Sequence, residues 1–99
     1  MKVTKMPKTQ LLESGKVYKN LKMIAEGNTI GPKHLSVEES VLTMIKGKAI
    51  LKIEDTSVEL NVGDTIIIPG GVAHYLEIIE DTEAIHTMSI GNKIKLLAE

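Results

Sequence analysis

The sequence contains no cysteine, phenylalanine, tryptophan or arginine, and these absences exclude several kinds of site. Without cysteine, neither a disulfide framework nor a thiolate site can form. Proteins that bind nucleic acid commonly use arginine forks and aromatic stacking platforms. All twelve basic residues here are lysine, and the two aromatic residues are Tyr18 and Tyr75, so we expect no nucleic-acid partner. The six lysines among residues 1–24 are interpreted as a solvated face.

Long apolar runs are also missing. No segment approaches the roughly 18 consecutive apolar residues that a membrane span needs. No signal-peptide pattern opens the chain. We therefore expect no membrane partner and a cytoplasmic location.

The chain is short and its apolar residues are almost all aliphatic. Its 99 residues suffice for one small domain, whose core must be built from the 30 Ile, Leu and Val residues. Pairing with a second copy would let so small a domain bury more surface. We therefore expect a homodimer.

Short runs of β-branched and alternating apolar residues, separated by turn residues, predict an all-β protein. The expected strands cover residues 21–25, 29–35, 41–45, 49–53, 58–60, 65–68, 74–79 and 84–90. The turn residues Glu26–Asn28 and Lys46–Lys48 predict two hairpins, and residues 80–82 predict a further turn. Strands at roughly ten-residue spacing favour a small antiparallel barrel or sandwich.

The two ends of the chain differ from its middle. We expect residues 1–20 to form an N-terminal arm, residues 21–92 a β-barrel, and residues 93–99 a tail with a weak helical pattern. The expected strand at residues 65–68 is apolar on both faces. Its outer side therefore needs cover, from a partner subunit or from the arm.

The most informative stretch is GDTIIIPGGVAHYLE, residues 63–77. A Gly-Asp turn leads into the apolar strand, which Pro69 must end because proline cannot donate to a sheet ladder. Two glycines follow, and the next strand begins at His74, which shares its face with Leu76. A titratable imidazole therefore lies at the start of a strand and points the same way as its apolar neighbours.

This spacing resembles the second motif of the cupin family, in which glycine, proline and histidine are separated by five and four residues. Gly63, Pro69 and His74 match that motif position for position. The family usually has asparagine four residues after the histidine, where this chain has Ile78. The resemblance extends more weakly over about residues 21–90. It implies a small antiparallel β-barrel of the jelly-roll (double-stranded β-helix) type, with a site at its mouth.

The family's first motif is only partly present. It contains a glycine, then His-x-His, a glutamate and a final glycine, and Gly47 fits that final glycine. Counting back from Gly47 places Ser40 at the glutamate position, Ser36 at the second histidine and His34 at the first. The leading glycine is best matched by Gly27, one residue out of register.

In the family, these side chains and the histidine of the second motif make a metal site of three histidines and one glutamate. The resemblance therefore implies a site at His34 and His74 in which serine, a poor ligand for divalent transition metals, occupies two ligand positions. His86, on the expected last strand, or Glu39, beside the lost glutamate, could supply a further ligand. We expect one divalent transition metal (Zn, Ni, Fe, Mn or Cu) or none. The expected pocket is lined by His34, Ser36, Ser40, His74 and His86.

Three functions remain open on this reasoning. The first is a protein that binds a small polar or aromatic-acid-like molecule through histidines that titrate near physiological pH. The second is a metal-dependent enzyme of the dioxygenase or isomerase type, in which His34 and His74 hold the metal. The third is a barrel whose site has decayed and which keeps a structural or interaction role. The fold cannot choose among them, because one fold supports many chemistries.

Overall fold

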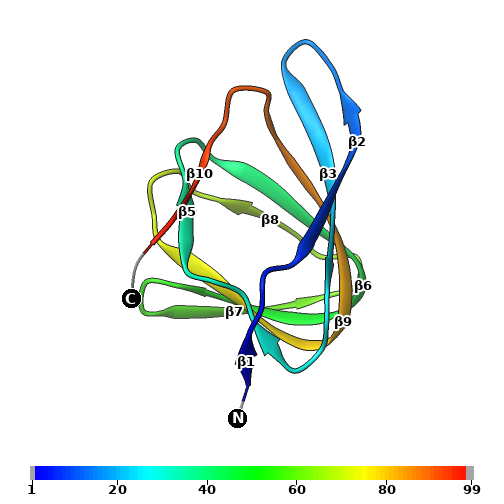
Figure 1. The fold of residues 1–99 in the computed structure, drawn as a ribbon, viewed down its shortest axis with the longest axis vertical. Coiled ribbons are helices and arrows are strands. Elements are labelled where there is room, and N and C mark those ends of the chain that lie inside the picture. The colour runs from blue at the N-terminus through cyan, green and yellow to red at the C-terminus, as the bar shows by residue number, and fades with distance from the viewer. Residues whose placement is uncertain (1, 98–99) are drawn as a thin grey trace.

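A computed structural model describes residues 2–97, and every regular element in that range is a β-strand (Figure 1). The strands are β1 (Val3–Thr4), β2 (Lys8–Ser14), β3 (Tyr18–Ala25), β4 (Thr29–Ile30), β5 (His34–Ser36), β6 (Ser40–Ile53), β7 (Thr56–Asn61), β8 (Thr65–Ile68), β9 (His74–Ser89) and β10 (Ile94–Leu96). Over the same residues, no helix that could cross a membrane is found.

Two long strands, β6 and β9, organise the sheet. β6 pairs with β7, β8 and β9, while β9 also pairs with β3, β4 and β5. All of these pairings are antiparallel. The sheet curls around an interior that Figure 1 views nearly end-on. The small antiparallel β-barrel expected from the sequence is therefore confirmed.

The two long strands are each continuous where the sequence predicted a turn. β6 runs unbroken through residues 46–48, and β9 runs unbroken through residues 80–82. The predicted hairpin and the predicted turn at these positions are therefore wrong. Gly47 has a φ of +85°, and the β6–β9 register shifts on both sides of it, which identifies β-bulges. Bulges bend a strand without ending its pairing, so these residues form a corner of the barrel.

Two other local predictions also fail. Glu26–Asn28 does turn the chain, with Asn28 at a φ of +64°. The predicted hairpin is nevertheless wrong, because β3 and β4 follow one another along the same edge of β9 and both pair with it. In the tail, Ile94–Leu96 is a strand and pairs with β5, so the helical pattern is wrong there. Residues 98–99 of the tail lie outside the described residues.

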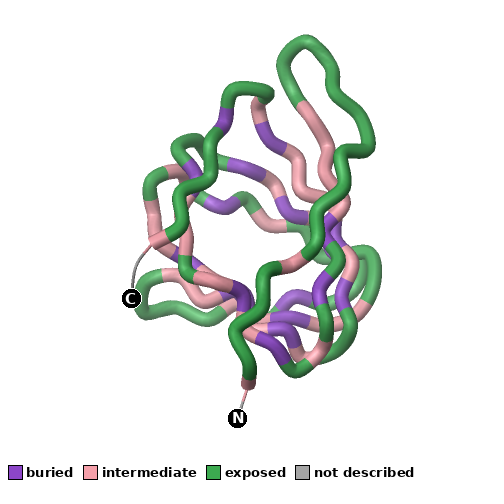
Figure 2. Tube along the Cα trace, viewed as in Figure 1, coloured by how far each residue is buried: buried purple, intermediate pink, exposed green. Residues whose placement is uncertain are grey.

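The core of the barrel is aliphatic, as the composition predicted. It consists of Met23, Ala25, Leu42, Met44, Ala49, Leu51, Leu60, Ile68, Leu76, Ile78 and Ala84. Even-numbered residues of β9, apart from Glu80, face inward on both sides of the bulge. Figure 2 shows buried positions along the barrel wall and an exposed β2–β3 hairpin that projects beyond it.

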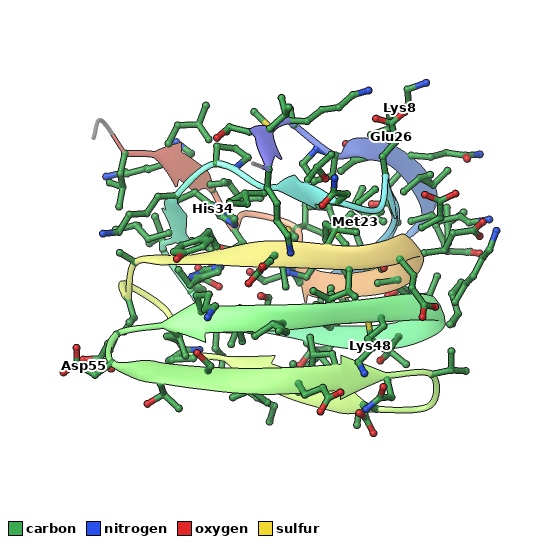
Figure 3. The ribbon with its side chains drawn as sticks, turned by 90° about the horizontal axis from the view of Figure 1, so that it is seen from below. Lys8, Met23, Glu26, His34, Lys48 and Asp55 are labelled. Atoms are coloured by element: carbon green, nitrogen blue, oxygen red, sulfur yellow. The ribbon has the colours of Figure 1, made fainter. Side chains whose placement is uncertain are left out.

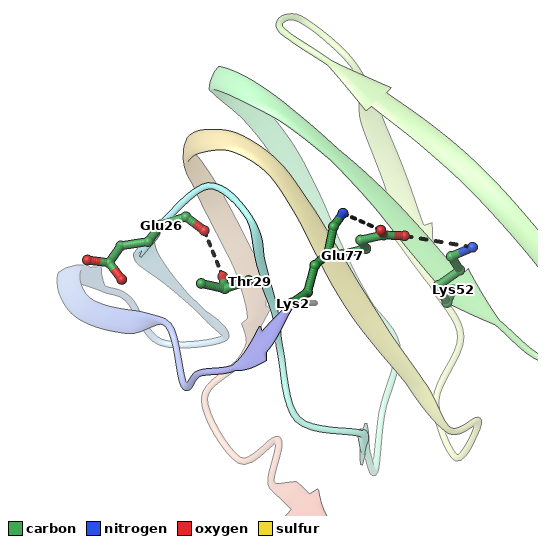
Figure 4. Close-up of polar contacts among 5 residues, drawn as sticks. All are labelled: Lys2, Glu26, Thr29, Lys52 and Glu77. Atoms are coloured by element: carbon green, nitrogen blue, oxygen red, sulfur yellow. Dashed lines mark hydrogen bonds and ion pairs between the residues drawn. The ribbon is translucent and has the colours of Figure 1, made fainter.

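The N-terminal segment adds two strands to the sheet. β2 pairs antiparallel with β3, and β1 pairs parallel with β4. Glu77 of β9 makes ion pairs with Lys2 and, at 3.9 Å, with Lys52 of β6, which joins the start of the chain to both long strands (Figure 4). In the same view, the hydroxyl of Thr29 donates to the backbone oxygen of Glu26 at 2.7 Å. Because this segment lies along β3 and β4, it leaves Ile67 of β8 61% exposed.

Candidate functional site

His34 and His74, forty residues apart in the sequence, lie directly opposite each other in the β5–β9 register. Their ring centroids are 4.4 Å apart, and the ring planes meet at 62°, an edge-to-face arrangement. Figure 3 shows His34, at the start of β5, among the side chains between the strands. The two imidazoles predicted from the cupin motifs therefore do converge.

Matching backbone hydrogen bonds hold the two histidines in place. The amide of Gly31, three residues before His34, donates to the carbonyl of Leu76, two residues after His74, at 2.8 Å. Reciprocally, the amide of Gly71, three residues before His74, donates to the carbonyl of Ser36, two residues after His34, at 2.7 Å. The pair is therefore positioned by the main chain, before any ligand is present.

The third histidine reaches the same place because β9 coils. Twelve residues of straight strand would separate His74 from His86 by about 40 Å. The bulges of β9 curl it around the barrel, so that both of its ends contribute to one cavity of about 110 Å³. All three histidines line this cavity. The sequence could place His86 only on an apolar face, and the structure places it in the site.

The remaining lining of this cavity, which we call the histidine cavity, is uncharged. The barrel wall contributes aliphatic side chains, among them Met23, Leu42, Ile68 and Leu76. The terminal segments contribute Pro7, Thr9 and Ile94. The cavity is therefore an apolar space in which imidazole nitrogens are the main polar groups.

Hydrogen bonds within the protein occupy one nitrogen of each ring. Nδ1 of His34 lies 2.8 Å from the carbonyl oxygen of Pro32, and Nδ1 of His74 lies 2.9 Å from that of Val72. Nε2 of His86 lies 2.8 Å from the hydroxyl of Ser40. Across residues 2–97, every buried side-chain nitrogen or oxygen has a hydrogen-bond partner. The second nitrogen of each ring has none, so it is at least partly exposed, and all three rings line the histidine cavity.

Burial favours the neutral form of two of these rings. Burial lowers the pKa of His74, against the opposing effect of its hydrogen bond to Val72, and the neighbouring His34 lowers it further. Burial, with smaller effects from His34 and His74, lowers the pKa of His86 to about 4. At neutral pH these two rings therefore carry no charge.

The other predicted site residues lie outside the cavity lining. Ser40 is buried behind His86 and touches the cavity only through that ring. Ser36 is also buried, and its hydroxyl donates to the backbone oxygen of Glu38 at 2.8 Å, within the turn that follows β5. Glu39 is exposed and is not among the residues that line the cavity.

The side chains present do not fit the metal site that the cupin motifs imply. His34 and His74 have the form of metal ligands. Each donates Nδ1–H to a backbone carbonyl, which orients the ring and leaves Nε2 free. The position of the motif's glutamate is occupied by Ser40, which bonds to His86. Within the described residues, no three His, Cys, Asp or Glu side chains are grouped closely enough to hold a metal ion. Two nitrogen ligands fall short of the three that catalytic zinc sites usually have.

Sequence reasoning missed the contributions of Pro7, Thr9 and Ile94, which come from segments assigned to the arm and the tail. No local signal in those segments points to the cavity. A signal for the histidine pair was present, however. Both histidines end the pattern Gly-x-x-His, at residues 31–34 and 71–74, and each glycine makes one of the two reciprocal bonds.

The barrel is similar to several solved structures. A conserved Klebsiella pneumoniae protein with a double-stranded β-helix domain matches 95% of this chain and 86% of its own, with a TM-score of 0.81 and 15% identity. A cupin-2 domain protein from Shewanella frigidimarina matches 86% and 82%, with a TM-score of 0.77 and 17% identity. The DMSP lyase of Ruegeria pomeroyi has a TM-score of 0.83 at 15% identity, with 92% of this chain covering 51% of the lyase. At these identities the likeness shows the fold alone.

Comparison by sequence identifies the family. No protein of curated function matches the chain. The family model of the cupin domain matches residues 20–91, which include the histidine pair, the bulged strands and both motif regions. This protein therefore belongs to the cupin family.

Proposed function

We propose that this protein binds a small organic molecule in the histidine cavity and needs no metal ion to do so. One observation carries the proposal: three imidazoles, each with one nitrogen that has no hydrogen-bond partner among residues 2–97, line a cavity that is otherwise uncharged. A polar group in an apolar space that lacks a partner costs about 1–3 kcal/mol. A ligand that supplies the missing hydrogen bonds recovers that cost and also buries apolar surface of its own.

Binding can be tested on metal-free protein. Protein purified without a metal-binding tag and dialysed against a chelator is screened against small fragments by thermal shift and by amide NMR. We expect fragments that raise Tm and shift resonances of residues around the cavity. The shifts should be lost in His34→Ala and in His74→Ala, and retained in Ser14→Ala, a control at the exposed end of β2. Fragments that bind all four proteins equally would contradict the proposal.

The second candidate is a metal-dependent enzyme of the dioxygenase or isomerase type. It is favoured by the free Nε2 atoms of His34 and His74, and by the barrel's likeness to larger enzymes. Besides the lyase, these include the salicylate 1,2-dioxygenase of Pseudaminobacter salicylatoxidans, with a TM-score of 0.74 and 13% identity, of which this chain covers 25%. Elemental analysis separates the candidates. About one equivalent of Zn, Ni, Fe, Mn or Cu, lost in both His34→Ala and His74→Ala, would confirm the metal site that the enzyme hypothesis needs and overturn the metal-free proposal.

A third outcome is a barrel that no longer binds anything in the cavity. It would be indicated if neither metals nor fragments raise Tm and the histidine substitutions leave the protein's behaviour unchanged. The mutual hydrogen bonding of the two Gly-x-x-His segments argues against decay, because it holds both rings in a defined orientation.

A further inference from the structure

The proton positions on two of the histidines follow from their partners. A backbone carbonyl can only accept a hydrogen bond. Nδ1 of His34 and Nδ1 of His74, each bonded to a carbonyl oxygen, must therefore carry the proton. In the neutral ring the other nitrogen, Nε2, is then a bare acceptor. Both rings line the histidine cavity, so the pair offers hydrogen-bond acceptors to it.

The third histidine, His86, presents a hydrogen-bond donor where the pair presents acceptors. The hydroxyl of Ser40 bonds to Nε2 of His86 and makes no other hydrogen bond among residues 2–97. Ser40 is 3% exposed, so its single proton has no partner unless it is donated to that nitrogen. Nδ1 of His86 then carries the ring proton and is a donor. The three imidazoles therefore offer the cavity two acceptors and one donor, beside the hydroxyl of Thr9, which can do either.

The rest of the cavity limits the size and the charge of its occupant. An apolar cavity of about 150 Å³ accommodates benzene. The histidine cavity, at about 110 Å³, is partly open to solvent, so it suits a molecule of about one ring whose remainder can extend outward. No lysine or carboxylate lines it, so an ionised ligand would give up its hydration and meet no counter-charge. A carboxylate would also direct its lone pairs at the two bare Nε2 atoms.

We infer that the histidine cavity selects a small uncharged molecule bearing a hydroxyl group, such as an alcohol or a phenol, which donates to Nε2 of His34 or His74 and accepts from Nδ1 of His86. This inference rests on the proposed function and names the ligand class of the same site. Of the small polar or aromatic-acid-like molecules that the sequence suggested, it keeps the first and excludes the second, because no charged side chain lines the cavity.

The inference can be tested with three molecules of one ring size. Phenol has the hydroxyl group, toluene has no polar group, and benzoate has a carboxylate that is ionised at pH 7. Affinities are measured by amide NMR titration of the full chain in chelator-treated buffer. We expect phenol to bind at least about fivefold more tightly than toluene, because only phenol can form a hydrogen bond with the imidazoles. We expect benzoate to bind most weakly of the three. The advantage of phenol over toluene should vanish in the double variant His34→Phe, His74→Phe and persist in Ser14→Ala.

A second measurement needs no substitution and so does not depend on the folding of a variant. Long-range ¹H–¹⁵N spectra of the wild-type imidazoles should show Nε2 unprotonated in His34 and His74 and Nδ1 protonated in His86. Phenol should move the Nε2 signals of the histidine pair.

Each contrary result has a separate meaning. Benzoate binding more tightly than phenol at the same resonances, phenol binding no better than toluene, or the opposite tautomers in the free protein would overturn the inference while leaving the proposed function standing. If none of the three molecules perturbs resonances around the cavity, the inference fails together with the proposed function.

Discussion

At the scale of single residues, the histidine cavity contains two rings whose neutral form is favoured, His74 and His86. His34 and His74 meet edge to face at 4.4 Å, and both are near enough to His86 to affect its pKa. A charge on one ring opposes a charge on the next, and burial opposes a charge on His74 and on His86. The apolar lining and the crowding of the imidazoles therefore act together to keep these two rings uncharged.

This arrangement makes stability depend on pH through His86. In the unfolded chain its pKa is about 6.5, whereas in the folded protein it is about 4. As the pH falls from 6.5 to 4, the unfolded state takes up a proton that the folded state does not, so the free energy of unfolding decreases. The loss is complete below pH 4 and corresponds to about 3 kcal/mol. His74, whose pKa is also lowered, acts in the same direction.

Urea unfolding of wild type and His86→Leu at pH 7.5 and pH 4.5 measures this effect. We expect the wild type to lose about 2–3 kcal/mol more than the variant between the two values. The variant leaves the hydroxyl of Ser40 without its partner, but that cost is the same at both pH values and cancels. The ion-paired carboxylates, such as Glu77 and Glu83, also titrate in this pH range, but they are present in both proteins and their effect on the difference cancels. Equal losses in the two proteins would show that His86 titrates normally in the fold.

At the scale of elements, the site depends on the bulged corner shared by β6 and β9. Gly47 lies on the bend of β6 at a φ of +85°. A Cβ placed there would come within 2.1 Å of the backbone oxygen of Asp81 and 2.8 Å of the hydroxyl oxygen of Thr82. Only a residue without a side chain lets the two strands approach so closely. This close approach coils β9 and brings its two ends to one cavity.

The chain offers a matched pair of substitutions for this corner. Gly63 has a similar φ of +93°, but a Cβ there would meet no atom within 4 Å. Gly63→Ala should cost about 1 kcal/mol, from the strained backbone alone. Gly47→Ala should cost at least about 3 kcal/mol, because backbone must also move. Denaturant unfolding of both variants gives the comparison, and equal costs would mean that the corner is looser than the structure shows.

These same elements show best how much of the fold could be predicted from the sequence. The spacing from Gly63 through Pro69 to His74 places a histidine at a strand start because a proline and a glycine pair act locally, and the prediction was correct. Lys46–Lys48 predicts a hairpin from the sequence alone, because a glycine that can adopt positive φ suits a turn and a bulge equally well. After Gly47 the chain could turn back on itself or continue as one strand paired with β9. The outcome depends on the rest of the sheet, and no local sequence pattern encodes it.

The candidate site shows the same limit. The pairing of His34 with His74 was predicted through the family's motifs, yet the position of His86 depends on how far β9 coils, which only its bulges determine. Ser36 and Ser40 matched ligand positions in the motif, but their hydroxyls are used by Glu38 and His86. Motif spacing predicts where a side chain lies along a strand, while its hydrogen-bond partner depends on residues that arrive from elsewhere.

At the scale of the whole molecule, segments outside the cupin match complete the cavity. The family model covers residues 20–91, whereas Pro7, Thr9 and Ile94 line the histidine cavity from outside that range. β2 holds Thr9 against β3, and β10 holds Ile94 against β5. The barrel therefore supplies the imidazoles, and the terminal strands supply much of the apolar boundary that determines what fits beside them.

The sequence also led us to expect a homodimer, and the outer face of the barrel offers a surface for it. Ile67 and Thr65 of β8 lie opposite Val41 and Thr43 of β6, and the same two β6 residues lie opposite Thr87 and Ile85 of β9. These six residues are uncharged and all β-branched, so two copies related by a two-fold axis would meet without like charges. The N-terminal strands lie along β3 and β4 and leave this face open. We propose that two copies pair through it.

Sedimentation velocity over a range of protein concentrations tests this pairing. We expect the wild type to be dimeric and Ile67→Lys to be monomeric, because a two-fold contact would bring the two new charges together. The control is Val17→Lys, in the turn between β2 and β3, where the replaced side chain is also 61% exposed. Since both side chains are exposed, neither substitution should change the stability of the monomer by more than about 0.5 kcal/mol. A wild type that remains monomeric at every concentration, or a Val17→Lys variant that dissociates equally, would exclude this face as the interface.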